Sequence, residues 1–281
     1  MPTEKSYKIK LDKSTKKLNG GFVSLYLSHT LKNYEKLMKA MILAAGLGTR
    51  LRPLTNYQPK AMVEVNGIPL IEFVIRRLKY FGFDDIIINV HHFADQITNF
   101  LEKKNNFDIN ITISDERDKI LETGGGLKKA ATFFNDEPFL LCNTDILSDI
   151  DLRKMYDTHL RSNALATLAV RKRETSRYFI FNDSNILHGW MNIKSGEIKI
   201  FRNSKGIFKM LAFSGIHIIN PEIFDFMNQK EGFFSIIDIY LEAIQNHTIM
   251  GFQHDDGLWL DVGKRISLEE ASRIIDEIPL A

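Results

Sequence analysis

The residues best suited to chemistry in this sequence gather between positions 38 and 64. A short apolar run, Ala40 to Ala44, predicts a buried strand that leads into a turn containing two glycines. Backbone N–H groups in such a turn can point together at an anion, because glycine adopts φ values that other residues avoid. Arg50, Arg52 and Lys60 follow and suit several phosphates at once. We therefore expect a turn that binds a triphosphate, formed by Ala44, Ala45, Gly46, Gly48 and Thr49.

Two further stretches carry residues that could bind a metal or a ligand. Asn143, Thr144 and Asp145 follow an apolar run directly, so a carboxylate is expected at the tip of a strand. Such a carboxylate suits Mg²⁺, which prefers oxygen ligands and keeps several waters, although a capping aspartate is the alternative. Three consecutive glycines occupy positions 124–126, and their entropic cost indicates that something approaches the backbone closely. A plain turn that caps a helix is the competing interpretation.

The stretch from 46 to 60 resembles the signature of the sugar-1-phosphate nucleotidylyltransferases. That signature reads G-x-G-T-R-L-x-P-L-T and is followed by P-K. Neither a dinucleotide-binding fingerprint nor a P-loop fits, because the third glycine of the first and the Gly-Lys-Ser/Thr of the second are missing. The matching residues are Gly46, Gly48, Thr49, Arg50, Leu51, Pro53, Leu54, Thr55, Pro59 and Lys60.

The resemblance implies a role for each group of residues. Arg50 and Lys60 would be the catalytic cations that stabilise the triphosphate and the departing pyrophosphate. Asp145, joined by Asp261 of the sequence W-x-D-x-G, would hold the cofactor Mg²⁺. The family's loop beside the nucleobase corresponds to Glu122, Thr123, Gly124 and Gly125.

The sugar-binding residues are less clearly marked than the nucleotide-binding ones. Gly215 lies in a stretch that resembles the family's F-x-G-I strand, where the glycine leaves room for the sugar. Asn143 and Trp190 are further candidates. The family's E-K-P motif, whose lysine grips the sugar phosphate, is absent. Arg177 and Arg202 are the nearest cations, and we favour Arg202 as the replacement.

The resemblance implies nucleotidyl transfer from a nucleoside triphosphate to a sugar 1-phosphate. Three features are most similar to those of N-acetylmuramate-1-phosphate uridylyltransferases of cell-wall recycling: the spelling of the signature, the sequence L-E-T-G-G-G and the absence of E-K-P. This similarity favours UTP as the nucleotide substrate. Mannose- or heptose-1-phosphate guanylyltransferases are the alternative. Two other classes stay open: a glycosyltransferase, although Asn143 stands where its D-x-D motif would need an aspartate, and a sugar-nucleotide sensor without activity.

Composition excludes several other classes of protein. The 281 residues are 44% apolar and carry a net charge of +2, yet positions 1–39 alone carry nine lysines against three acidic residues. The remaining chain is slightly acidic, which argues against nucleic acid as a partner. No apolar run approaches the roughly 20 residues that span a bilayer. The single cysteine, Cys142, fits a reducing compartment. We expect a cytoplasmic protein without a membrane partner, as a monomer or small homo-oligomer.

The order of the expected elements indicates an α/β fold. In the first half, strands alternate with helices, typical of βαβ units and a sheet covered on both faces. The expected strands are 40–44, 86–88, 110–114 and 139–142, and the helices are 70–81, 94–103 and 127–133. Short strands between 165 and 219 predict a β-rich insertion that binds the sugar, followed by helices from 221, 236 and 267.

With the resemblance, these elements predict the Rossmann-like α/β/α fold of nucleotide-diphospho-sugar transferases, with a mixed, mostly parallel sheet. The nucleotidylyltransferase domain is expected at 38–281. Residues 1–37 are expected to be an N-terminal extension, either a flexible tail or an artefact of start assignment.

Overall fold

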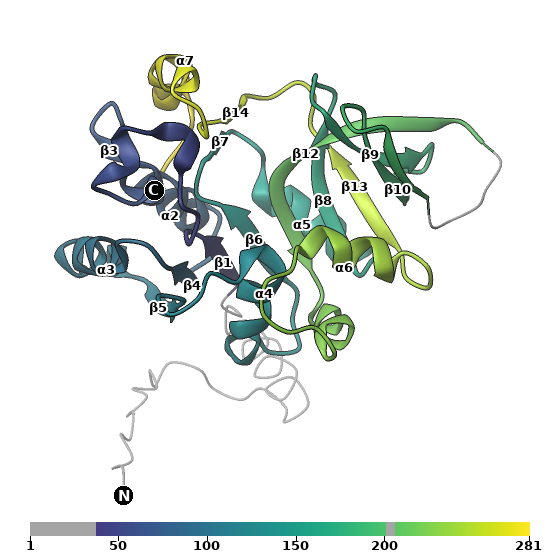
Figure 1. Cartoon of the computed structure of the whole chain (residues 1–281), viewed down its shortest axis with the longest axis horizontal. Helices are drawn as coiled ribbons and strands as arrows, with labels where there is room; N and C mark the ends of the chain where they lie inside the picture. Colours follow the sequence, from purple (N-terminus) through teal and green to yellow (C-terminus); the bar gives the residue numbers. More distant parts are fainter. Residues whose placement is uncertain (1–37, 201–205) are drawn as a thin grey trace, which may run out of the picture. The chain divides into compact units, whose positions relative to one another are not determined.

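The structure is a computed structural model that describes residues 38–200 and 206–281 (Figure 1). The predictions about Arg202 and about the extension 1–37 therefore lie outside the described residues. The helices are α2 (Leu70–Tyr80), α3 (Ala94–Lys103), α4 (Glu122–Lys129), α5 (Leu152–Arg161), α6 (Ile236–Ala243) and α7 (Ile266–Ile274). The strands are β1 (Lys39–Leu43), β2 (Glu64–Val65), β3 (Ile68–Pro69), β4 (Asp85–Val90), β5 (Asn110–Asp115), β6 (Phe139–Asn143), β7 (Ile146–Ser148), β8 (Ala166–Arg171), β9 (Arg177–Asn182), β10 (Leu187–Asn192), β11 (Glu197–Ile200), β12 (Phe208–Ile219), β13 (Ile249–Gln253) and β14 (Trp259–Asp261).

One large mixed sheet organises these elements. Its strands follow the order β11-β10-β9-β12-β6-β1-β4-β5, and β8 pairs with β12 and β13. Strands β6, β1, β4 and β5 are parallel, whereas β12 runs antiparallel to β6, β8 and β9. The expected mixed α/β sheet is confirmed, with continuous parallel pairing in the half that contains β1. From β1 the chain proceeds to β4 and β5 on one side and later returns to β6 on the other, which is a topological switch point.

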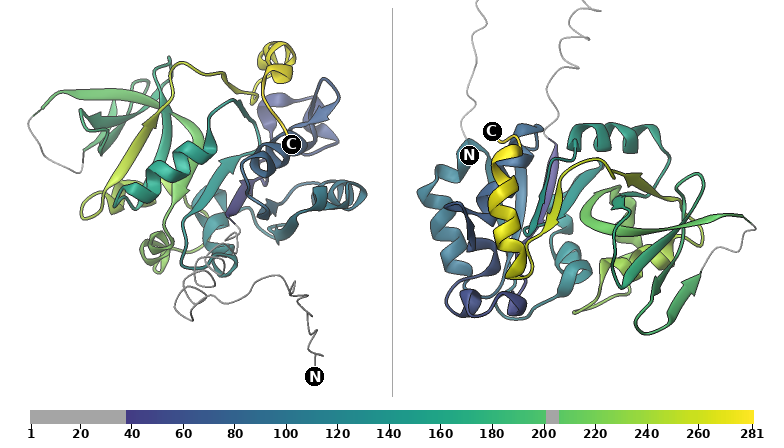
Figure 2. Two further views of the ribbon diagram at one scale, coloured as in Figure 1. Left: turned by 180° about the vertical axis from the view of Figure 1, so that it is seen from behind. Right: turned by 90° about the horizontal axis from the view of Figure 1, so that it is seen from above.

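Alternating side chains of the central strands face two separate hydrophobic cores. In β1, Ala40 and Ile42 point into the core that is shared with α2, α3, α5 and α7. Met41 points the opposite way, into the core that contains α4 and α6. Helices thus cover both faces of the sheet, as predicted. The C-terminal helix α7 lies beside β2 (Figures 1 and 2), where Asn66 Nδ2 donates to the Ser272 carbonyl at 2.9 Å.

The β-rich insertion is continuous with the main sheet. Strand β12 is 12 residues long, so its first half pairs with β9 and its second half with β6. A register shift between Phe213 and His217 on the β8 side marks the point between the halves, where Gly215 has a φ of 79°. The strand that carries Gly215 therefore joins the insertion to the parallel half of the sheet.

One helix prediction was wrong in position. The chain 122–126, expected to be a loop ahead of a helix, forms the first turns of α4, which ends at Lys129. Packing overrides the low helix propensity of glycine here, because the glycines are buried against neighbouring chain. The segment from Pro221 to Met227 is a 3-10 helix. No helix within residues 38–200 and 206–281 has the length and apolar character needed to cross a bilayer.

Candidate active site

A cavity of about 310 Å³ opens at the carboxyl ends of β1 and β6, the position where open α/β sheets bind ligands. Segments distant in sequence form its wall. They are the turn after β1, the ends of β4 and β5, the start of α4, the turn after β6 and the end of β14. The lining residues are Leu43, Ala44, Ala45, Gly46, Arg50, Lys60, Asn89, Glu116, Ile120, Glu122, Thr123, Asn143, Thr144, Asp145 and Asp261.

The two glycines of the predicted phosphate-binding turn have different roles. Gly48 has a φ of 61°, and a Cβ there would lie 2.9 Å from Lys60 Cβ, so glycine is needed for the fold. Its carbonyl also accepts a hydrogen bond from Thr55 Oγ1 at 2.8 Å. Gly46 lines the cavity, and a Cβ there would meet no protein atom within 4 Å. The free space beside Gly46 is available to a ligand.

A buried asparagine holds the first residues of this turn. Asn89, at the end of β4, is 2% exposed, and its Oδ1 accepts from the Ala44 N–H at 2.7 Å and the Ala45 N–H at 3.3 Å. Its Nδ2 donates to Glu116 Oε1 at 2.8 Å. Glu116 is 1% exposed, and burial raises the pKa of its carboxyl while the Asn89 hydrogen bond opposes the rise. This pair connects the turn to the opposite side of the cavity.

Two carboxylates meet through strand pairing. Asp145 follows β6, and Asp261 ends β14, which pairs antiparallel with β7 so that Asp261 lies opposite Ile146. The Val262 N–H donates to the Asp145 carbonyl at 2.8 Å. The fold thus joins two aspartates that lie over a hundred positions apart in the sequence, as the resemblance implied.

Lys60 forms an ion pair with Asp145 beside the cavity. Both side chains are mostly buried, at 15% and 10% exposure. Burial raises the pKa of Asp145, Lys60 opposes that rise, and the neighbouring charge of Asp261 adds to it. A cation between the carboxylates would relieve their repulsion, and two carboxylates leave positions for waters and phosphate oxygens, as Mg²⁺ prefers. The donor set therefore fits the expected metal.

Arg50 supplies a positive charge that the described protein does not neutralise. No carboxylate within the described ranges lies within 4.0 Å of its guanidinium. Its guanidinium lies against Gly263, where a Cβ would come within 2.7 Å of Nη2. Gly263 also donates its N–H to Asp261 Oδ1 at 2.7 Å. Arg50 is consequently free to bind an anion beside the two aspartates.

Residues predicted to contact the base divide into two groups. Glu122 and Thr123 line the cavity, and Glu122 has a φ of 63°, which is uncommon for a residue with a side chain. The N–H groups of Gly124 and Gly125 instead donate to the Phe234 carbonyl, at 2.9 and 3.2 Å. The two glycines are absent from the cavity lining, and the neighbouring chain explains their lack of side chains.

Of the predicted sugar-binding residues, Asn143 and Gly215 are in direct contact with each other. Asn143 lines the cavity, and a Cβ on Gly215 would lie 3.0 Å from Asn143 Nδ2. Trp190 lies on β10, outside the cavity lining, with Lys199 Nζ 5.6 Å from its ring centroid. Arg202 lies outside the described residues.

Sequence reasoning missed Asn89 and Glu116. A signal for Asn89 was present, because a polar residue interrupts the apolar run of β4 just before its carboxyl end. Glu116 directly follows β5 and could have been found in the same way. Their hydrogen bond depends on the parallel pairing of β4 with β5, which periodicity alone does not place.

Comparison with known proteins identifies the family. The sequence matches the family described as Nucleotidyl transferase over residues 39–277. N-acetylmuramate alpha-1-phosphate uridylyltransferase of Neisseria meningitidis serogroup B is 32% identical over 243 residues, covering 84% of this chain and 98% of that protein. The Caulobacter vibrioides protein of the same name is 33% identical, covering 80% and 91%.

More distant comparisons agree with this assignment. Mannose-1-phosphate guanyltransferase of Yarrowia lipolytica is 30% identical over 81% of this chain, which spans 61% of that protein. The structure of a UDP-glucose pyrophosphorylase complexed with UDP-glucose has the same fold, with a TM-score of 0.70 at 17% identity, covering 86% of this chain and 99% of the other. The resemblance inferred from the signature is thus confirmed, and this chain belongs to the nucleotidyl transferase family.

Proposed function

We propose that this protein transfers a uridylyl group from UTP to N-acetylmuramate 1-phosphate and releases pyrophosphate. The main support is one cavity that contains Arg50, Lys60, Asp145 and Asp261 beside the turn after β1. Further support comes from two relatives named for this reaction, of which this chain covers 98% and 91%.

The proposed chemistry needs positioning and charge compensation. An oxygen of the sugar phosphate attacks the α-phosphorus, and the bond from that phosphorus to the pyrophosphate oxygen breaks in line with it. The attacking phosphate is already ionised, so no general base is required. Arg50 and Lys60 would stabilise the charge on the triphosphate and the departing pyrophosphate. Asp145 and Asp261 would hold Mg²⁺, which neutralises phosphate charge when bound.

The residues in the wall of the cavity support the remaining roles in this proposal. The Ala45 and Gly46 backbone would lie along the phosphates, since space beside Gly46 is open. Glu116, Glu122 and Thr123 lie on the side of the cavity where the base would bind, and Asn143 lies on the side of the sugar strand β12.

A guanylyltransferase acting on mannose 1-phosphate is the second candidate. The observation in its favour is the 30% identity to the Yarrowia lipolytica enzyme over 81% of this chain. A carboxylate such as Glu116 can accept a hydrogen bond from the N3–H of uracil or the N1–H of guanine. Turnover with both triphosphates distinguishes the two candidates.

The test is pyrophosphate release with Mg²⁺ across a grid of substrates. The grid crosses five nucleoside triphosphates with the 1-phosphates of N-acetylmuramate, mannose, heptose, glucose and N-acetylglucosamine. The proposal predicts the highest kcat/KM for UTP with N-acetylmuramate 1-phosphate. A maximum at GTP with mannose or heptose 1-phosphate would replace it with the second candidate. A blank grid from folded protein that binds nucleotide would favour a glycosyltransferase or a sensor.

A further inference from the structure

Arg173 lies two positions beyond β8 and is held at one face of an aromatic ring. Its guanidinium carbon is 4.4 Å from the centroid of the Trp259 ring, and its Nη2 donates to the Phe213 carbonyl at 2.9 Å. Trp259 Nε1 donates to the next carbonyl along β12, that of Ser214, at 2.9 Å. Arg173 and Trp259 therefore both contact β12 immediately before Gly215. Stacking fixes the guanidinium plane, and Nη1 also donates to the Glu174 carbonyl at 3.5 Å.

The charge of Arg173 has no carboxylate partner in the described part of the chain. No Asp or Glu oxygen there lies within the 4.0 Å of an ion pair, and its Nε is buried without an acceptor. Burial lowers the pKa of Arg173, and Asp261 is the largest influence opposing that change. The charge of a half-buried guanidinium without a carboxylate partner is unfavourable alone, and an anion bound beside it would offset that cost.

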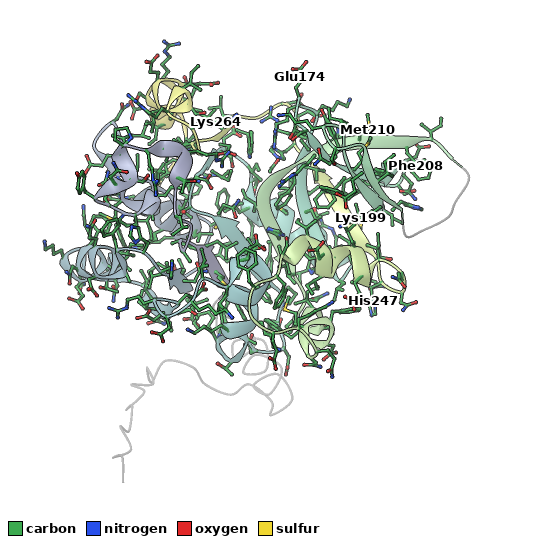
Figure 3. The ribbon with its side chains drawn as sticks, viewed as in Figure 1. Glu174, Lys199, Phe208, Met210, His247 and Lys264 are labelled. Atoms are coloured by element: carbon green, nitrogen blue, oxygen red, sulfur yellow. The ribbon has the colours of Figure 1, made fainter. Side chains whose placement is uncertain are left out.

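Two arginines that have no carboxylate partner among the described residues flank the turn that carries Asp261. Arg173 stacks on Trp259, two residues before Asp261, and Arg50 lies against Gly263, two residues after it. They come from different parts of the fold. Glu174, which follows Arg173, lies on the β-rich insertion, and Lys264, which follows Gly263, lies beside α7 (Figure 3). Arg50 belongs to the turn after β1, whereas Arg173 is bonded to the sugar strand β12.

We propose that Arg173 binds the phosphate group of the sugar 1-phosphate. This inference rests on the proposed nucleotidyl transfer, in which two phosphorylated substrates must meet beside Asp145 and Asp261. Arg50 and Lys60 serve the triphosphate. Arg173 is the corresponding cation for the second substrate, because it is anchored to the carbonyl two residues before Gly215.

The structure favours Arg173 over the other nearby cations. Arg177, considered from the sequence, is exposed at the start of β9. Lys172 is also exposed, and its backbone N–H, not its side chain, is bound to Asp255 Oδ1 at 2.7 Å. Arg171 donates to the carbonyls of Asp255 and Gly257. Arg173 combines burial, an unused donor and proximity to Asp261.

The test compares Arg173→Lys and Arg173→Gln with the control Lys172→Gln. The substrates are those for which the wild type is most active, and KM is measured separately for the sugar 1-phosphate and for the triphosphate. Both Arg173 variants are expected to raise the KM for the sugar 1-phosphate about tenfold or more, as for lost hydrogen bonds to a charged group, and to change the KM for the triphosphate less than about twofold. Lys172→Gln should change neither.

Two outcomes would overturn the inference. One is an unchanged KM for the sugar 1-phosphate in Arg173→Gln. The other is an equal loss for both substrates together with a lower melting temperature in both variants, which would assign Arg173 to holding Trp259 in place. If the wild type transfers no nucleotidyl group to any sugar 1-phosphate, the proposed function itself fails. In an active wild type, the KM comparison tests Arg173 alone.

Discussion

The buried pair of Asn89 and Glu116 gives a quantitative prediction for the variant Asn89→Asp. The substitution keeps Oδ1 as the acceptor for the Ala44 and Ala45 N–H groups and replaces the Nδ2 donor with a carboxylate oxygen. Two ionised carboxylates 2.8 Å apart would repel each other by about 6 kcal/mol at an effective dielectric constant of 20. We therefore expect the variant to retain one proton between the two groups at neutral pH.

The shared proton makes the stability of the variant depend on pH. Unfolded Asp and Glu release their protons near pH 4, so between that pH and the raised pKa the folded variant binds more protons than the unfolded chain. Its free energy of unfolding therefore falls as pH rises. The expected slope is about 1.4 kcal/mol per pH unit steeper than that of the wild type near pH 7 to 8.

Urea unfolding at pH 6, 7, 8 and 9 measures this slope, and pyrophosphate release follows activity in the same buffers. The control Asn89→Ala removes the acceptor and adds no second carboxylate, so its stability should fall with pH less steeply than that of Asn89→Asp over this range. Equal slopes for Asn89→Asp and the wild type would show that water reaches the pair and screens it, which would refute the buried connection between the turn and Glu116.

Three further predictions concern the ion pair, the glycine helix and the core. Lys60→Ala should lower kcat/KM by roughly 10²-fold or more, since one cation is lost at the triphosphate; a loss below about threefold would remove its catalytic assignment. Gly125→Ala should lower stability by about 1–3 kcal/mol in urea unfolding, because its Cβ would clash with the Gly232 carbonyl; a gain, the usual result of Gly→Ala in a helix, would contradict this packing. Burial lowers the pKa of His217 from 6.5 to about 3, so this histidine takes up a proton when the protein unfolds at pH 5. That uptake should lower the free energy of unfolding by about 2 kcal/mol at pH 5 relative to high pH. The double variant with His217→Phe and Tyr240→Phe should lose that part of the pH dependence; an unchanged difference in stability between pH 7 and 5 would count against it.

The sequence predicted the parts of the site that depend on local patterns. The apolar run before Gly46 and the polar residues after Cys142 placed two strand ends, and the resemblance brought Asp145 and Asp261 together as the fold does. The two strand ends were predicted correctly because the carboxyl ends of parallel strands meet at one edge of a sheet. Asp261 instead reaches Asp145 through the antiparallel pairing of β14 with β7.

Contacts between segments that are distant in the sequence could not be predicted from local sequence patterns. The run of glycines predicted a loop. The chain around Phe234 packs closely against these glycines and makes α4 possible, and this contact cannot be inferred from local helix propensity. Arg173 was passed over for similar reasons. Its stacking on Trp259 and its hydrogen bond to the Phe213 carbonyl distinguish it from the neighbouring cations, and both contacts join segments that are distant in the sequence.

Turnover by Asp145→Ala tests the central claim most directly, because this residue joins the ion pair with Lys60 to the predicted metal site. The measurement is pyrophosphate release by wild type and variant with Mg²⁺ and the best substrates of the grid, after circular dichroism has shown that the variant is folded. We predict that turnover is abolished while the folded structure is retained. Near-normal turnover by folded Asp145→Ala would contradict the assignment of this cavity as the site of nucleotidyl transfer.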